Sequence, residues 1–89
     1  MEDFLLAIKQ TFYFDMKDGV TVRDRIGMQF MFDAEAITHS KELAERFRHE
    51  RTHDEPDLSI CVIDEAGKEI HRELVYPADL KINPLQKSG

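Results

Sequence analysis

The chain has 89 residues, of which 42% are hydrophobic and 34% charged, and its formal net charge is −6 at pH 7. This length fits one domain, and an acidic chain without a run of Lys or Arg argues against a nucleic-acid partner. The single cysteine excludes an intrachain disulfide, and the apolar stretch at residues 4–8 is too short for a signal peptide or a membrane span, so we expect a small soluble cytoplasmic domain without a membrane partner.

The first predicted element is a strand at residues 11–17. Aromatic and apolar residues alternate there with polar ones, and those expected to face a core are Phe12, Phe14 and Met16. A period of two is typical of a strand with one buried face. Gly19 allows the positive φ of a tight turn, so residues 20–23 are predicted to return as a second strand. Residues 24–27 form a second turn, and residues 28–30 are either a short third strand or an extended connection.

An amphipathic helix is predicted from about residue 34 to residue 51. Apolar and small residues recur there at spacings of three and four: Ala36, Ile37, Ser40, Leu43, Ala44 and Phe47. This spacing places them on one helical face, and the small members allow that face to lie close to a sheet. Asp33 is predicted to be the N-cap, because its carboxylate can accept hydrogen bonds from the amides of the first turn.

Two more strands are predicted after the helix. Residues 58–63 are apolar on both faces, which indicates a central position in a sheet. Gly67 suits a hairpin loop, and residues 69–76 return as a more polar strand whose inward residues are predicted to be Ile70, Leu74 and Tyr76. The complete order predicts an α+β fold: a four-stranded antiparallel or mixed sheet in ββαββ order, with one long helix packed on one face.

We divide the chain into an N-terminal extension at residues 1–10, a single α+β domain at residues 11–78 and a flexible C-terminal tail at residues 79–89. The extension carries four large apolar residues: Phe4, Leu5, Leu6 and Ile8. Burying each of them stabilises by about 1.5–3 kcal/mol. We therefore expect the extension to dock on the chain's own sheet or, preferably, on a second copy.

An ordered set of motifs runs through most of the chain. It consists of the aromatic run at residues 12–14, Asp18-Gly19, Asp24 with Gly27 and Phe30, Asp33 at the start of an Ala-rich helix, and the strand and hairpin at residues 60–67. The set resembles a family of short uncharacterised bacterial proteins, a domain of unknown function, from about residue 12 to residue 78. The resemblance implies the same small α+β fold in a cytoplasmic bacterial protein and brings no activity. Members often carry a His where this chain has Asp15, and they begin closer to the first strand.

The candidate chemical sites are weak. His49 and His53 have a spacing that can chelate a metal ion, but a closed zinc site needs about four ligands, so neither a metal nor a cofactor is predicted. Cys61 beside His71 is considered as a nucleophile, although its apolar neighbours favour a packed side chain. No phosphate-binding loop or catalytic motif occurs, and we predict no enzyme.

The predicted function follows from the sheet. One helix covers one face, which leaves Tyr13, Ile63 and Val75 on the other, where apolar residues favour a partner. The leading hypothesis is a non-catalytic protein-interaction or homo-oligomerising module with predicted interface residues Phe4, Leu5, Ile8, Tyr13 and Ile63. The alternative is a small-ligand or metal-binding regulatory domain that uses the helix-end histidines. The carboxylates of Asp15, Asp18 and Asp24 cluster around the first hairpin, and the turn chemistry of Asp18-Gly19 is a sufficient explanation for them.

Overall fold

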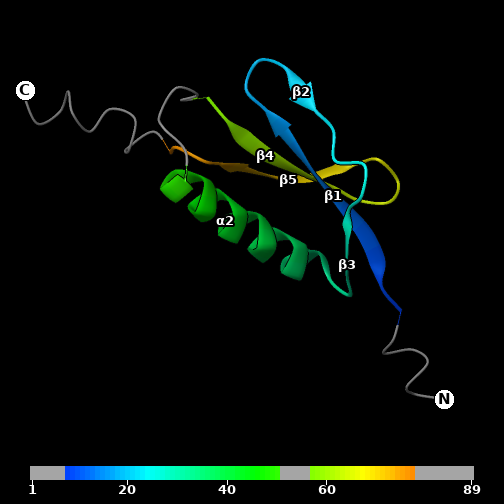
Figure 1. The fold of residues 1–89 in the computed structure, drawn as a ribbon. Coiled ribbons are helices and arrows are strands. Elements are labelled where there is room, and N and C mark those ends of the chain that lie inside the picture. The colour runs from blue at the N-terminus through cyan, green and yellow to red at the C-terminus, as the bar shows by residue number, and fades with distance from the viewer. Residues whose placement is uncertain (1–7, 51–56, 78–89) are drawn as a thin grey trace, which may run out of the picture.

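The computed structural model describes residues 8–50 and 57–77. Within these residues the fold consists of one helix and a five-stranded antiparallel sheet (Figure 1). The elements in chain order are β1 (Gln10–Lys17), β2 (Thr21–Val22), β3 (Met28–Phe30), α2 (Asp33–Glu50), β4 (Ser59–Ile63) and β5 (Glu69–Leu74). The predicted α+β class is confirmed, with one strand more than expected.

The sheet has the order β2-β1-β4-β5, and β3 also pairs with β1. β4 therefore lies between two strands, which confirms the central position predicted from its apolar residues. Phe14 lies opposite Val62 and Met16 opposite Ile60, so apolar residues of the two inner strands share one face. The helix covers this face, mainly over β4 and β5 (Figure 1).

β2 and β3 are successive parts of one interrupted edge. β2 pairs with the end of β1 through Met16 and Val22, and β3 pairs with its beginning through Phe12 and Met28. The intervening residues 23–27 lie opposite the shorter stretch 13–15. Extra residues on one strand form a bulge, so residues 28–30 are a third strand beyond this bulge and not an extended connection.

The core lies between the helix and this sheet. Phe12, Ile60 and Val62 are fully buried, and Phe30 of β3 packs against them from the side. The helix residues buried against the sheet are Ala36, Ser40 and Ala44. Their small size permits the close approach that the sequence predicted, and the Ser40 hydroxyl donates to the Ile37 carbonyl at 2.6 Å, which satisfies this buried polar group.

The helix begins differently from the prediction. The carbonyl of Phe32 accepts hydrogen bonds from the amides of Glu35 and Ala36, so Phe32 and not Asp33 occupies the N-cap position. The Glu35 carboxylate accepts from the Met31 and Phe32 amides at 3.0 and 3.1 Å. Glu35, in the first turn, thus accepts hydrogen bonds from amides that precede the helix, as in a capping box. It provides the carboxylate acceptor that was expected from Asp33. The prediction of Asp33 as N-cap is therefore wrong.

The inward face of β5 is also partly different from the prediction. Leu74 is 44% exposed, whereas Val75 is fully buried in the core. The reason is a register shift opposite Val62 and Ile63, where a β-bulge changes the phase of β5. Such a bulge leaves one extra residue and reverses the alternation beyond it. Ile70 and Tyr76 do pack inward, but the placement of Leu74 inward and of Val75 on the open face is wrong.

Candidate interaction surface

Asp24 holds the interrupted edge together. Its carboxylate accepts hydrogen bonds from the amides of Phe14 on β1 and of Ile26 and Gly27 in its own loop, at 2.9–3.1 Å. Burial alone would raise the pKa of Asp24, but these amide hydrogen bonds outweigh it and the pKa is lowered. The carboxylate thus replaces the ladder hydrogen bonds that the bulge interrupts.

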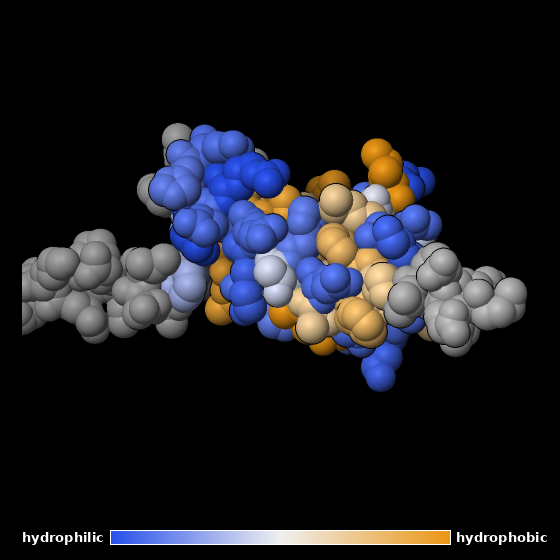
Figure 2. Space-filling model, turned by 90° about the horizontal axis from the view of Figure 1, so that it is seen from below, coloured by the Kyte–Doolittle hydropathy of each residue, from blue (hydrophilic) through white to orange (hydrophobic). Residues whose placement is uncertain are grey.

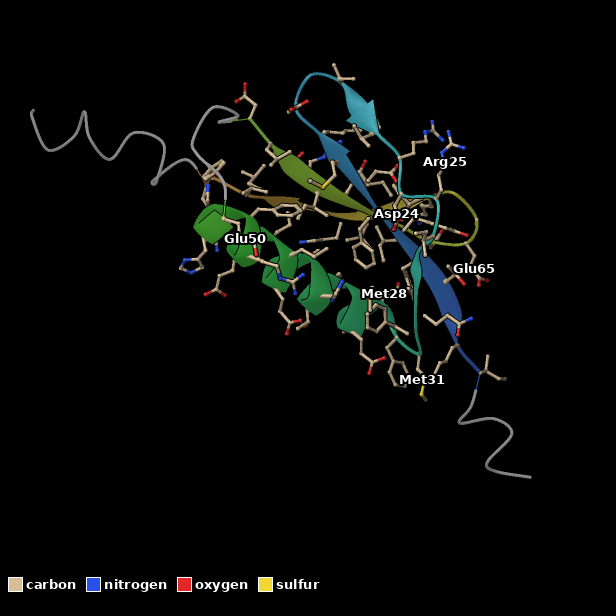
Figure 3. The ribbon with its side chains drawn as sticks, viewed as in Figure 1. Asp24, Arg25, Met28, Met31, Glu50 and Glu65 are labelled. Carbon is tan, nitrogen blue, oxygen red and sulfur yellow. The ribbon has the colours of Figure 1, made fainter. Side chains whose placement is uncertain are left out.

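Gly27 brings the chain back onto β1. Its φ is +75°, and a Cβ at this position would lie 2.7 Å from Thr11 Cγ2 and 2.9 Å from the Phe12 carbonyl oxygen. Only glycine fits a backbone with this conformation and this close an approach. Asp24 lies over β1 while Arg25 projects away from the strands (Figure 3). The spacing Asp24-x-x-Gly27 therefore has a structural role.

The β2–β3 edge, residues 20–32, carries most of the exposed apolar surface. Seven large apolar side chains are exposed among the described residues, and five of them belong to this edge: Val20, Val22, Ile26, Met28 and Phe32. Ile26 at the bulge is 87% exposed. Seen from below, apolar residues gather towards β3 and the beginning of α2, while the far end of the helix is hydrophilic (Figure 2). Clustered exposed apolar residues mark interaction sites.

The same edge has a local positive charge. Arg23 and Arg25 are both exposed, and the Asp24 carboxylate between them is occupied by backbone amides. The chain as a whole has a net charge of −6. The β2–β3 edge is therefore apolar, and its own side chains carry a net charge of +1 on an acidic protein.

The open face of the sheet carries part of the predicted interface. Tyr13 and Ile63 lie opposite each other across β1 and β4 and are half-buried, so the structure brings these two predicted interface residues together. Leu74 and not Val75 adds an apolar side chain to this face. Ile8 is 54% exposed, whereas Phe4 and Leu5 lie outside the described residues.

Cys61 and His71 do not form a pair. Cys61 is fully buried and lies opposite Arg72, whereas His71 lies opposite Val62, one position along the strand and thus on the other face. Burial raises the pKa of the Cys61 thiol, with a further increase from the nearby Glu69 carboxylate. A thiol in this setting is mostly protonated and behaves as a packed apolar group.

A cavity of about 250 Å³ on the open face is lined by Tyr13, Asp15, Arg23, Asp24, Ile63, Asp64, Glu65 and Gly67. Its carboxylates all accept backbone hydrogen bonds. Asp15 accepts from the Asp24 amide, Asp64 from the amides of its own hairpin, and Glu65 from the Thr11 amide at 2.7 Å. These carboxylates cap loops and strand ends.

The described histidines have different surroundings. His39 packs between Phe14 and Phe30, with ring centroids 4.9 and 5.6 Å away, beside a cavity of about 340 Å³ that also includes Thr38. His49 is exposed on the helix, and His53 lies outside the described residues. Across residues 8–50 and 57–77, no three His, Cys, Asp or Glu side chains are placed to hold a metal ion together.

These features define a small α+β domain in which most of the exposed large apolar side chains among the described residues lie along one sheet edge. Residues 11–73 match the domain of unknown function DUF6894, and the chain belongs to this family. No curated protein and no solved structure matches the chain. In the part of the chain that the structure describes, no helix has the length and apolar character needed to cross a membrane.

Sequence reasoning missed the β2–β3 edge. It treated residues 24–27 as an ordinary turn, although Arg25 and Ile26 in this stretch are both exposed, Ile26 to 87%. The available signal was Ile26, a large apolar residue within the predicted turn at residues 24–27. Turns are normally polar, so this residue indicates a surface with another purpose.

Proposed function

We propose that this domain is a small non-catalytic protein-interaction module that self-associates through the β2–β3 edge. The observation that supports it is the concentration of exposed apolar side chains at residues 20–32, within a fold whose core lies elsewhere. The outer strand of a sheet also presents unpaired backbone groups that can pair with another chain. The single cysteine is unpaired, which supports a reducing compartment such as the bacterial cytoplasm.

Burial of the apolar side chains of the β2–β3 edge gives enough free energy for association. Covering a large apolar side chain stabilises an interface by about 1.5–3 kcal/mol when burial is complete. The combined burial of Val22, Ile26 and Met28 therefore contributes several kcal/mol to the free energy of association. The entropy lost on association offsets part of this gain. A micromolar dimer corresponds to about 8 kcal/mol, so the edge supplies a contribution of the right order.

Sedimentation equilibrium over a wide range of protein concentrations tests this function. We expect the unmodified chain to self-associate and the double variant Val22→Lys/Ile26→Lys to remain monomeric, because a buried lysine without a partner is strongly unfavourable. The matched control is Leu74→Lys, another exposed apolar residue but outside the β2–β3 edge. A strictly monomeric unmodified chain, or equal loss of association in the control, would contradict the proposed function.

A further inference from the structure

Resting on the proposed function, we propose that the partner of the β2–β3 edge is the N-terminal segment, residues 2–8, of a second copy of this chain. The segment would bind in an extended conformation beside β3 and β2, and the two copies would exchange their segments. Residues 1–7 lie outside the described residues, and the properties that match the segment to this edge are those of its amino-acid sequence.

The two surfaces are complementary in charge. The segment begins with Glu2 and Asp3, and the edge presents Arg23 and Arg25 on both sides of an acid that is already bonded to backbone amides. Asp24 keeps its negative charge, so residues 20–32 carry a net charge of +1. Arg23 also lines the open-face cavity beside Asp15, Asp64 and Glu65, whereas Arg25 projects away from the strands (Figure 3). An acidic segment is therefore attracted mainly to Arg25, even though two copies of the chain repel each other overall.

The two surfaces also match in apolar character. In an extended segment, side chains two apart lie on the same face, which places Phe4, Leu6 and Ile8 together. Val22 and Met28 share one face of the edge, because they lie opposite Met16 and Phe12 of β1. Both residues are exposed and can receive the apolar face of the segment.

The lengths of the segment and the edge agree. Seven extended residues span about 23 Å, and the eight residues of β1 that the edge follows span about 27 Å. One segment can therefore reach from β3, past the bulge, to β2. The bulge itself discourages regular pairing with an arbitrary strand, so the side chains must supply much of the affinity.

The connection to β1 favours a second copy as the source of the segment. Phe30 at the end of β3 lies opposite Gln10 at the start of β1, so the chain enters β1 and leaves β3 at the same end of the sheet (Figure 1). A segment folded back from Gln10 to the outer side of β3 would cross the connection from β3 to α2. Connections at one end of a sheet avoid such crossings, whereas exchange between two copies does not require one.

A charge exchange tests this inference on the full chain. We expect both Glu2→Lys/Asp3→Lys and Arg23→Glu/Arg25→Glu to weaken self-association by about tenfold or more, because each replaces attraction by repulsion at both contacts of the dimer. An equimolar mixture of the two variants restores opposite charges at both contacts. Sedimentation of the mixture should therefore show a dimer that neither variant forms alone. Arg23 and Arg25 are exposed, and thermal melting of each variant verifies its fold.

The outcomes separate this inference from the proposed function. If the N-terminal charge reversal leaves self-association intact while Val22→Lys/Ile26→Lys abolishes it, the edge binds something else and the segment is not its partner. If both charge variants are monomeric and their mixture is too, exchange between copies is wrong. If the unmodified chain is monomeric throughout, the proposed function itself fails together with this inference.

Discussion

The two edges of the sheet differ in the side chains that they expose. The β5 edge is charged: Arg72 forms a two-contact ion pair with Glu69 at 3.1 and 3.2 Å, and Glu73 bonds to Lys41 and His71 at 3.1 and 2.8 Å. The β2–β3 edge exposes mainly apolar side chains. Charged residues on an edge strand discourage pairing with another chain, so the two edges have opposite tendencies to associate.

This difference indicates how a small sheet can limit association to one side. The β2–β3 edge is not simply unprotected, because its strands are very short and a bulge separates them. Both features prevent continuous pairing with an arbitrary strand. The apolar side chains beside the bulge remain available to a partner of the correct shape, which favours a specific complex over open-ended aggregation.

The largest effect is expected from Gly27→Ala, which displaces the β2–β3 edge. The added Cβ would lie 2.7 Å from Thr11 and 2.9 Å from the Phe12 carbonyl oxygen, in a backbone with φ of +75°. We expect the free energy of unfolding to fall by about 3 kcal/mol or more, measured by urea denaturation.

Gly67→Ala is the matched control for this change. Gly67 also has a positive φ, of +85°, but no atom lies within 4 Å of its expected Cβ. Only the conformational cost of about 1 kcal/mol remains. Equal destabilisation by the two substitutions would show that close packing at β1 does not hold the edge.

The next largest effect is expected from Asp24→Asn. The substitution removes the charge that accepts amides from Phe14, Ile26 and Gly27, and we expect a loss of about 1.5–3 kcal/mol. Because the pKa of Asp24 is lowered in the folded protein, its stabilising contribution is complete above the pKa of the unfolded chain, about 4, and is lost as the pH falls through the folded value.

Urea denaturation between neutral pH and pH 3 measures this dependence. The unmodified chain should lose more stability on acidification than Asp24→Asn does. Asp18→Asn is the control, since Asp18 is exposed and makes one long contact of 3.4 Å to the Val20 amide. Identical pH profiles for the unmodified chain and Asp24→Asn would contradict the role of the carboxylate.

A smaller effect is expected from removing the charges of the β5 edge. Glu69→Val with Arg72→Val deletes the ion pair of an exposed edge strand and leaves β-branched apolar residues that favour strand pairing. We expect new association, seen by light scattering, that Val22→Lys/Ile26→Lys does not prevent. If the double β5 variant stays in the same assembly as the unmodified chain, charge does not protect this edge.

The smallest effect is expected from Lys41→Met. Lys41 is 56% exposed and contacts Glu73 at 3.1 Å, and exposed ion pairs contribute less than about 1 kcal/mol. Glu73 keeps its contact with His71. The melting temperature should therefore change little, and a large decrease would mean that helix α2 depends on this contact for its position.

Much of the fold could be predicted because local patterns determine it. Phe12 and Phe14 alternate, and Ala36, Ser40 and Ala44 recur at helical spacing, so β1 and α2 follow from side-chain periodicity. Local patterns could not predict which sheet face Leu74 and Val75 each occupy, because a bulge in the pairing of β4 with β5 determines it. Pairing between strands is a tertiary property that no single segment encodes.

The candidate surface was harder to predict than the fold. Tyr13 and Ile63 were assigned to a common face from alternation, and they do lie opposite each other. The exposed position of Ile26 depends on the hydrogen bonds of Asp24 to β1, which join residues ten positions apart across two strands. An aspartate that only forms a turn and an aspartate that also bonds to a neighbouring strand, as Asp24 does, look the same in the sequence. Only the three-dimensional contacts distinguish them.

The position of β1 in the middle of the sheet has a consequence for how the chain folds. On one side β1 pairs with β2 and β3, which follow it closely, but its other neighbour β4 comes only after the whole helix. Closing such a long loop is entropically unfavourable and slows folding. During synthesis, Phe12 and Phe14 emerge well before the strand that covers their other side. We therefore expect the hairpin of β1 with β2 and β3 to form first, and the docking of β4 to limit the rate at which the domain reaches its native state.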